Sequence, residues 1–270
     1  MGGIDAKSSA GPGLRVARSR GYAISYEDVG QGSPVVLAPG FMQSAADYRE
    51  AGYVDRLAAT RRVLIVDPLG HGQSEKPHDP QAYRAPGVAA DVIAVLDAAG
   101  LERAALWGYS RGAWLACMAA IEFPHRLTAL ILGGAALTQP PPTEIPPWVD
   151  PLSRADWPAF WSLFPIPLSA ETKRHFEEVN DPKALAAERI GRIESAYAFD
   201  LGRASVPALV YCGGNDDAND AAPTAQALKT KLRVVEGRDH AEAFGAVDSV
   251  MPFAVPFLKT VDSRRKAVPR

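Results

Sequence analysis

Short apolar runs alternate with stretches of helical periodicity along most of the chain. The runs lie at residues 35–38, 62–67, 104–107, 127–132, 209–212 and 232–236, and such runs are typical of strands buried on both faces of a parallel sheet. Apolar residues at helical spacing between them predict helices at 88–99, 111–123 and 221–229. This alternation predicts an open α/β sheet with right-handed crossovers.

The sequence also predicts one hairpin and the end of one helix. A hairpin is expected over residues 14–28, with its turn near Ser19-Arg20-Gly21. The helix expected at 88–99 should end at Gly100, because glycine adopts the left-handed conformation that commonly ends a helix.

One segment interrupts the alternation. Residues 139–167 hold nine of the chain's 23 prolines, a density that excludes a regular sheet. Large aromatic residues crowd the same region, and residues 170–199 return to a helical pattern. A surface linker rarely carries so many aromatics, so we expect an inserted helical cap. The expected division is 1–136 for the first part of a core domain, 137–204 for the cap and 205–270 for the second part of the core.

The composition narrows the possible partners. The chain has 270 residues, of which 47% are hydrophobic, enough for a sizeable core. Its 29 Lys and Arg and 31 Asp and Glu give a net charge of −2, so no global field would hold nucleic acid or an anionic membrane. We expect a small-molecule substrate and either a monomer or a homodimer.

The two cysteines argue against a disulfide framework. Cys117 and Cys212 lie far apart within apolar runs, which predicts buried free thiols. Neither has the neighbouring Cys or His spacing of a zinc site, so no metal is expected.

No membrane or export signal is visible. The longest nearly apolar run, 129–137, is about half the length that a helix needs to cross a bilayer. Residues 1–13 lack the apolar segment of a secretory signal. We therefore expect a cytoplasmic protein.

The strongest chemical signal is Gly108-Tyr109-Ser110-Arg111-Gly112, which lies between an expected strand and an expected helix. A serine at a sharp strand-to-helix turn has a strained backbone, and the flanking glycines allow strand and helix to approach closely and expose its hydroxyl. Ser110 is therefore the candidate nucleophile.

A serine nucleophile needs a base, and the chain has five histidines. His240 directly follows the last expected strand, where loops of an α/β sheet line the ligand crevice, so it is the candidate base. The other four have other expected places: His71 in a tight turn, His78 in an exposed loop, His125 at a helix-to-strand corner and His175 on a solvated helix face.

The candidate acid follows the strand before His240. A carboxylate there could reach the imidazole, orient it and stabilise its cation. Asp216 and Asp217 are both possible on these grounds, with Asp220 more distant.

With these residues in the order Ser, Asp, His, the sequence resembles the α/β-hydrolase fold superfamily over about residues 20–260. The resemblance implies a mostly parallel eight-stranded sheet with helices on both faces. Residues 207–216 match the family's Pro-x-Leu-Val-x-x-Gly-x-x-Asp pattern, which favours Asp216 over Asp217. Residues 67–74 match the family's Asp-x-x-Gly-x-Gly-x-Ser turn, which is structural there.

The resemblance also implies an oxyanion hole. Pro39-Gly40-Phe41 falls at the family's oxyanion loop, so the N–H groups of Phe41 and Arg111 would stabilise the developing negative charge. The family commonly has His-Gly where this chain has Pro39-Gly40, which leaves the loop geometry open. The Arg111 guanidinium either pairs with a neighbouring acid or meets an anionic substrate.

The expected activity is hydrolysis of a carboxylic ester or lactone through an acyl-enzyme on Ser110, without metal or organic cofactor. C–C bond hydrolysis, perhydrolysis and acyl transfer can use the same triad, and the fold also hosts non-catalytic small-molecule-binding proteins. Cap aromatics are expected either to line an apolar substrate pocket or to pack onto the core; they are Trp148, Trp157, Phe160, Trp161 and Phe164.

Overall fold

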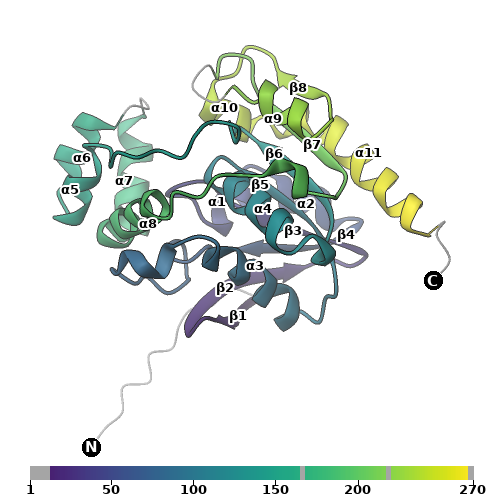
Figure 1. Cartoon of the computed structure of the whole chain (residues 1–270), viewed down its shortest axis with the longest axis horizontal. Coiled ribbons are helices and arrows are strands. Elements are labelled where there is room, and N and C mark those ends of the chain that lie inside the picture. Colours follow the sequence, from purple (N-terminus) through teal and green to yellow (C-terminus); the bar gives the residue numbers. More distant parts are fainter. Residues whose placement is uncertain (1–12, 165–167, 217–219, 267–270) are drawn as a thin grey trace, which may run out of the picture.

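One eight-stranded sheet organises the molecule. The computed structural model describes residues 13–164, 168–216 and 220–266, and within them the strand order is β1-β2-β4-β3-β5-β6-β7-β8 (Figure 1). Residues 1–12, on which most of the export-signal expectation rests, lie outside these ranges. The strands are β1 (Leu14–Ser19), β2 (Tyr22–Val29), β3 (Ser33–Ala38), β4 (Arg61–Val66), β5 (Ala104–Tyr109), β6 (Leu127–Gly133), β7 (Ala208–Gly213) and β8 (Leu232–Val235).

The predicted strands and hairpin are confirmed. β1 and β2 form an antiparallel hairpin, β2 pairs antiparallel with β4, and every pair from β4 across to β8 is parallel. β5 and β6 are buried at every position, as their unbroken apolar sequences predict for strands covered on both faces.

Helices cover both faces of the sheet. One face packs against α3 (Gly87–Ala98), α4 (Arg111–Glu122) and α9 (Ala222–Ala227). The other packs against α1 (Ala45–Glu50), α2 (Tyr53–Ala58), α10 (His240–Gly245) and α11 (Val247–Lys266). Gly100 follows α3 with a positive φ of 67°, which confirms the predicted stop.

Four further helices lie between β6 and β7 and gather at the left of Figure 1, apart from the helices that cover the sheet. They pack around an apolar cluster of their own, which includes Leu152, Phe160 and Leu185 and reaches Met42 of the core. They are α5 (Val149–Ser153), α6 (Trp157–Leu163), α7 (Ala170–Val179) and α8 (Pro182–Glu194). We refer to these four helices as the cap; the boundaries 137 and 204 stay a prediction.

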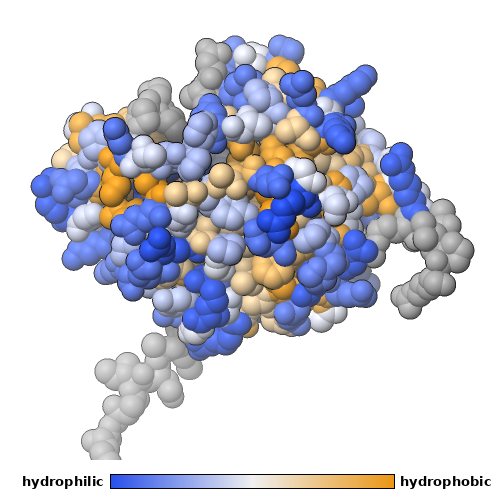
Figure 2. Space-filling view, in the orientation of Figure 1, coloured by the Kyte–Doolittle hydropathy of each residue, from blue (hydrophilic) through white to orange (hydrophobic). Residues whose placement is uncertain are grey.

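Few large apolar side chains are exposed among the residues that the structure describes. Figure 2 shows hydrophobic residues reaching the surface over the cap, and Leu163 of α6 and Val179 of α7 are exposed. Cys117 and Cys212 are buried free thiols, as predicted. None of the described helices is both long and apolar enough to span a membrane.

Candidate active site

Ser110 lies at the sharp turn between β5 and α4. Its φ of 53° and ψ of −117° place a non-glycine residue in a sparsely populated region, which costs about 1–3 kcal/mol and persists only where neighbours enforce it. The enforcing contacts include its N–H, which donates to the Gly133 carbonyl at 2.8 Å, and its carbonyl, which accepts from Trp114 N–H at 3.1 Å. The serine is thus held at the carboxyl end of the sheet.

The two flanking glycines are required by space. A Cβ at Gly108 would lie 2.0 Å from the Gly112 carbonyl oxygen, and a Cβ at Gly112 would lie 1.9 Å from the Ala38 carbonyl oxygen. Both distances are far below van der Waals contact, so strand and helix approach only because neither position has a side chain.

His240 and Asp216 meet in the structure. Asp216 follows β7, His240 opens α10 after β8, and His240 Nδ1 lies 2.6 Å from Asp216 Oδ2. The Asp216 side chain is 2% exposed and that of His240 is 20% exposed, so the carboxylate is shielded while the imidazole can reach the site. Asp217 lies outside the described residues, and Asp220 accepts from the N–H of Ala222 at the start of α9.

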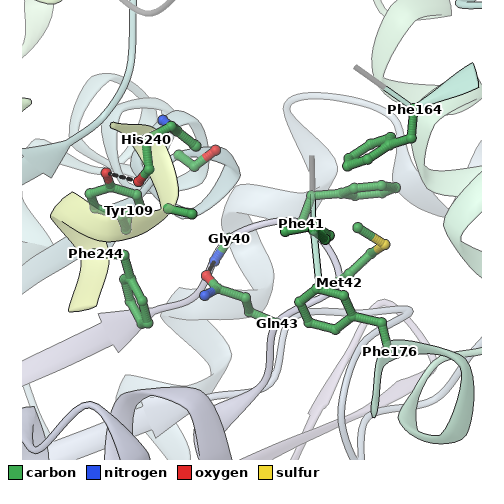
Figure 3. A pocket seen from close by; sticks show the side chains of 12 residues that line it. Gly40, Phe41, Met42, Gln43, Tyr109, Phe164, Phe176, His240 and Phe244 are labelled. Atoms are coloured by element: carbon green, nitrogen blue, oxygen red, sulfur yellow. Dashed lines mark hydrogen bonds between the residues drawn. The ribbon is translucent and has the colours of Figure 1, made fainter. Parts of the chain in front are cut away.

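Backbone contacts hold the loops that carry these two residues. Gly214 N–H donates to the Val235 carbonyl and Asn215 N–H to the Arg238 carbonyl, each at 2.9 Å, which ties the exit of β7 to that of β8. The Tyr109 hydroxyl donates to the His240 carbonyl at 2.6 Å, drawn as the dashed line in Figure 3. The residue preceding the serine therefore also positions the histidine.

Two backbone amides are available beside the serine. Neither Phe41 N–H nor Arg111 N–H donates a hydrogen bond to any part of the chain that the structure describes. The Gln43 side-chain oxygen accepts from Gly40 N–H at 2.9 Å and so fixes the loop, a role that the sequence reasoning missed. Pro39-Gly40 therefore replaces the family's His-Gly with a loop braced by Gln43.

An apolar cavity of about 110 Å³ opens over Ser110 and His240. Figure 3 shows Phe164, Met42 and Phe176 on one side of it and Tyr109, His240 and Phe244 on the other. Phe164 and Phe176 come from the cap, so cap and core build this cavity together.

Of the five aromatics expected to line a pocket, Phe164 does so. The other four pack with it in the cap's own apolar cluster, with ring centroids 4.6–5.9 Å apart in the pairs Phe160–Trp161, Trp157–Trp161 and Trp148–Phe160. The contacts of these four residues therefore fit the second expectation, packing within the protein. They are Trp148, Trp157, Phe160 and Trp161.

The Arg111 guanidinium pairs with an acid. Its Nε donates to Glu188 Oε1 at 2.8 Å, and each of these side chains is only 3% exposed. Burial alone would raise the pKa of Glu188, but the positive charge of Arg111, and next of Arg189, holds that pKa at about 2. Glu188 and its neighbouring arginines on α8 were not singled out from the sequence.

The other four histidines do not line the apolar cavity over Ser110. His78 pairs with Asp181 on the surface, and the exposed His125 and half-buried His175 belong to other elements. His71 is fully buried in the turn that follows β4, as the sequence predicts for the 67–74 motif. Burial, reinforced by the positive charge of Arg111, lowers the pKa of His71 to about 3.

The buried His71 should make the fold sensitive to acid. The unfolded chain takes up a proton on this histidine near pH 6.5, whereas the folded chain does so only near pH 3. Between these values we expect His71 alone to lower the free energy of unfolding by about 1.4 kcal/mol per pH unit as the pH falls. Urea titrations between pH 7 and pH 5 measure this slope.

A variant without the titrating ring provides the comparison. His71→Leu should flatten the slope, and His125→Gln, at an exposed histidine, should leave it unchanged. Equal slopes in His71→Leu and wild type would show that His71 does not contribute.

The described residues hold no group of three or more His, Cys, Asp or Glu side chains arranged to bind a metal ion. The site therefore consists of a strained serine, a histidine–carboxylate pair, two free amides and an apolar cavity.

This combination of sheet and serine turn defines a class of protein. A sequence model of the alpha/beta hydrolase fold matches residues 33–180, more than half of the chain. The chain therefore belongs to the alpha/beta hydrolase fold family.

Individual relatives match over shorter stretches or at lower identity. The 2-hydroxy-6-oxo-2,4-heptadienoate hydrolase of Pseudomonas putida is 36% identical over 124 residues, which are 45% of this chain and 44% of that protein. The match thus spans less than half the length of that relative. The enol-lactonase of Burkholderia xenovorans LB400 has a TM-score of 0.75 at 24% identity, covering 91% of this chain and all of that one. A carboxylesterase of Nitrososphaera gargenis has a TM-score of 0.77 at 17% identity, covering 93% and 99% of the two chains. At these identities the two solved structures share the fold.

Proposed function

We propose that the protein is a serine hydrolase that cleaves a carboxylic ester or lactone. The observation that carries this proposal is the 2.6 Å contact between His240 Nδ1 and Asp216 Oδ2, beside a serine held in a strained turn. A buried carboxylate in this position fixes the imidazole tautomer that can accept a proton on Nε2.

In the proposed mechanism, Ser110 Oγ attacks the substrate carbonyl while His240 Nε2 takes the hydroxyl proton. The Phe41 and Arg111 amides donate hydrogen bonds to the oxyanion, each such donor being worth a few kcal/mol in the transition state. His240 then protonates the leaving alcohol oxygen, and the acyl group stays on Ser110. Water attacks the acyl-enzyme while His240 accepts its proton, and His240 then returns a proton to Ser110 Oγ as the acyl C–O bond breaks and the carboxylic acid leaves.

C–C bond hydrolysis is the second candidate. This candidate is favoured by the match to the 2-hydroxy-6-oxo-2,4-heptadienoate hydrolase, which is 36% identical to this chain over 124 residues. The same serine, histidine and aspartate would serve that reaction. Ester or lactone hydrolysis is preferred because the two free amides and the apolar cavity beside Ser110 suit acyl transfer without further groups.

Labelling with a fluorophosphonate tests the activated serine. We expect one adduct on the wild-type protein by intact mass and none on Ser110→Ala, because only a serine activated by a base reacts rapidly. Absence of an adduct on folded wild type would contradict the proposed triad and favour a non-catalytic binding protein.

A substrate panel then separates the reactions. Short to long acyl esters, lactones and 2-hydroxy-6-oxo-2,4-dienoates are compared by kcat/KM. Faster turnover of the dienoates than of every ester and lactone would replace the proposed reaction with C–C hydrolysis. Acyl transfer to an added alcohol or to peroxide in preference to water would assign acyltransferase or perhydrolase activity.

A further inference from the structure

A second cavity also reaches Ser110. Its volume is about 180 Å³, and its walls include Ser110, Phe41 and Trp114 together with the side chains of Arg111, Arg189 and Arg192. Phe41 and Ser110 line both this cavity and the apolar one, so the nucleophile lies where the two meet. The two cavities differ in chemistry, one being apolar and the other lined by three guanidinium groups.

The protein neutralises the charge of this second cavity only in part, because one carboxylate, Glu188, faces three arginines. Glu188 pairs with Arg111 at 2.8 Å. Throughout the described ranges, no carboxylate oxygen lies within 4.0 Å of a guanidinium nitrogen of Arg189 or Arg192. The cavity therefore retains about two positive charges next to the nucleophile.

Aromatic rings hold these two cations in place. The Arg189 guanidinium lies 5.1 Å from the Phe41 ring centroid and 4.9 Å from that of Trp148, and Arg192 lies 4.7 Å from that of Trp114. Such cation–π contacts orient a guanidinium without consuming its hydrogen-bond donors. Both groups are thus fixed toward the cavity with donors to spare.

Keeping the two cations together is unfavourable, and the single Glu188 carboxylate offsets this cost only in part. Burial, followed by the neighbouring charge of Arg189, lowers the pKa of Arg192 to about 9, and burial likewise lowers the pKa of Arg189. Natural proteins commonly retain such destabilising arrangements where a ligand needs them.

We propose that Arg189 and Arg192 bind a carboxylate of the substrate, so that the substrates are esters or lactones bearing a second, anionic group. The anionic end would occupy the cavity of the arginines, and an apolar portion would occupy the cavity of Phe164 and Phe176. This inference rests on the proposed function for the cleaved bond. Arg111 is committed to Glu188, so Arg189 and Arg192 provide the recognition.

A pair of substrates of similar length tests the proposal. Mono-methyl adipate carries a carboxylate that methyl heptanoate lacks. We expect wild type to prefer the anionic ester in kcat/KM, and Arg189→Met and Arg192→Met each to lower that preference about 10- to 100-fold, the usual range for a charge-assisted hydrogen bond. Fluorophosphonate labelling of Ser110 should be retained in both variants.

The matched control is Arg154→Met, at an exposed cap arginine paired with Asp150, which should leave the preference unchanged. Melting temperatures distinguish recognition from packing. Removing one cation relieves repulsion, so Arg192→Met should melt no lower than wild type. A lower melting temperature with an unchanged preference would assign Arg192 a structural role and overturn the proposal.

Binding without turnover gives an independent readout. Calorimetry of mono-methyl adipate on the Ser110→Ala protein should show binding that weakens at least tenfold when Arg189→Met and Arg192→Met are added. Equal binding with and without the two arginines overturns the inference, whatever ester is cleaved. Absence of a Ser110 adduct in wild type, by contrast, overturns the proposed function.

Discussion

Asp216→Asn should lower kcat about a thousand- to ten-thousandfold while KM changes little. His240 Nδ1 lies 2.6 Å from Asp216 Oδ2, and in the proposed triad this contact leaves Nε2 free to take the proton of Ser110. An Asn amide of the same shape can donate its N–H₂ to Nδ1 and so favour the wrong tautomer, and it cannot stabilise the imidazolium. Steady-state kinetics on the best ester of the panel measure the loss.

Two neighbouring carboxylates serve as controls for this prediction. Asp217→Asn and Asp220→Asn should each retain kcat within about tenfold. The Asp220 side chain accepts from the N–H of Ala222 at the start of α9 rather than from His240. The rate of fluorophosphonate labelling should fall in Asp216→Asn alone. A large loss in Asp217→Asn with activity kept in Asp216→Asn would move the acid of the triad one residue along the chain.

The strands of the sheet could be predicted because their own sequences are apolar. β5 and β6 are apolar at nearly every position, and burial on both faces of a parallel sheet demands that pattern. The order of the strands and the packing of α11 against the far face arise from contacts distant in sequence, which no local pattern encodes. The exact partner of each helix therefore needed the structure.

The candidate triad was equally visible, because each of its residues stands directly after a strand. The carboxyl ends of parallel strands share one edge, so β5, β7 and β8 bring Ser110, Asp216 and His240 to the same place. Whether the aromatic residues of the cap line a cavity was harder to predict. Sequence shows that Trp148 and Phe160 are apolar but not whether they face a cavity or one another.

The second cavity, lined by Arg111, Arg189 and Arg192, could not be predicted from the sequence for a related reason. Glu188, Arg189 and Arg192 occupy one turn of α8, and charged residues at that spacing usually lie on a solvated face. Here Glu188 is instead buried and accepts a hydrogen bond from Arg111, 77 residues earlier in the chain at the start of α4. A charged residue beside alanines, a leucine and an isoleucine within α8 is the signal that could have suggested burial.

Glu188→Gln should lower the free energy of unfolding by about 3–5 kcal/mol, the usual cost of removing one partner of a buried ion pair. The neutral amide would leave Arg111 buried without a counter-charge beside Arg189 and Arg192. The control Glu194→Gln, at an exposed position on the same helix, should cost less than about 0.5 kcal/mol. Urea unfolding at pH 7 measures both.

The loss of unfolding free energy in Glu188→Gln should also depend on pH, and it should become smaller as the pH falls. The pKa of Glu188 is near 2 in the folded chain and 4.5 in the unfolded one, so its contribution is full above pH 4.5 and is lost as the pH falls toward 2. The difference between variant and wild type should therefore narrow below about pH 4.5. A difference that stays constant down to pH 3 would mean that the ionised carboxylate is not what stabilises the arginine cluster.

If the cluster binds a substrate carboxylate, mono-methyl adipate should stabilise Glu188→Gln more than wild type, because the bound anion supplies the negative charge that the variant lacks.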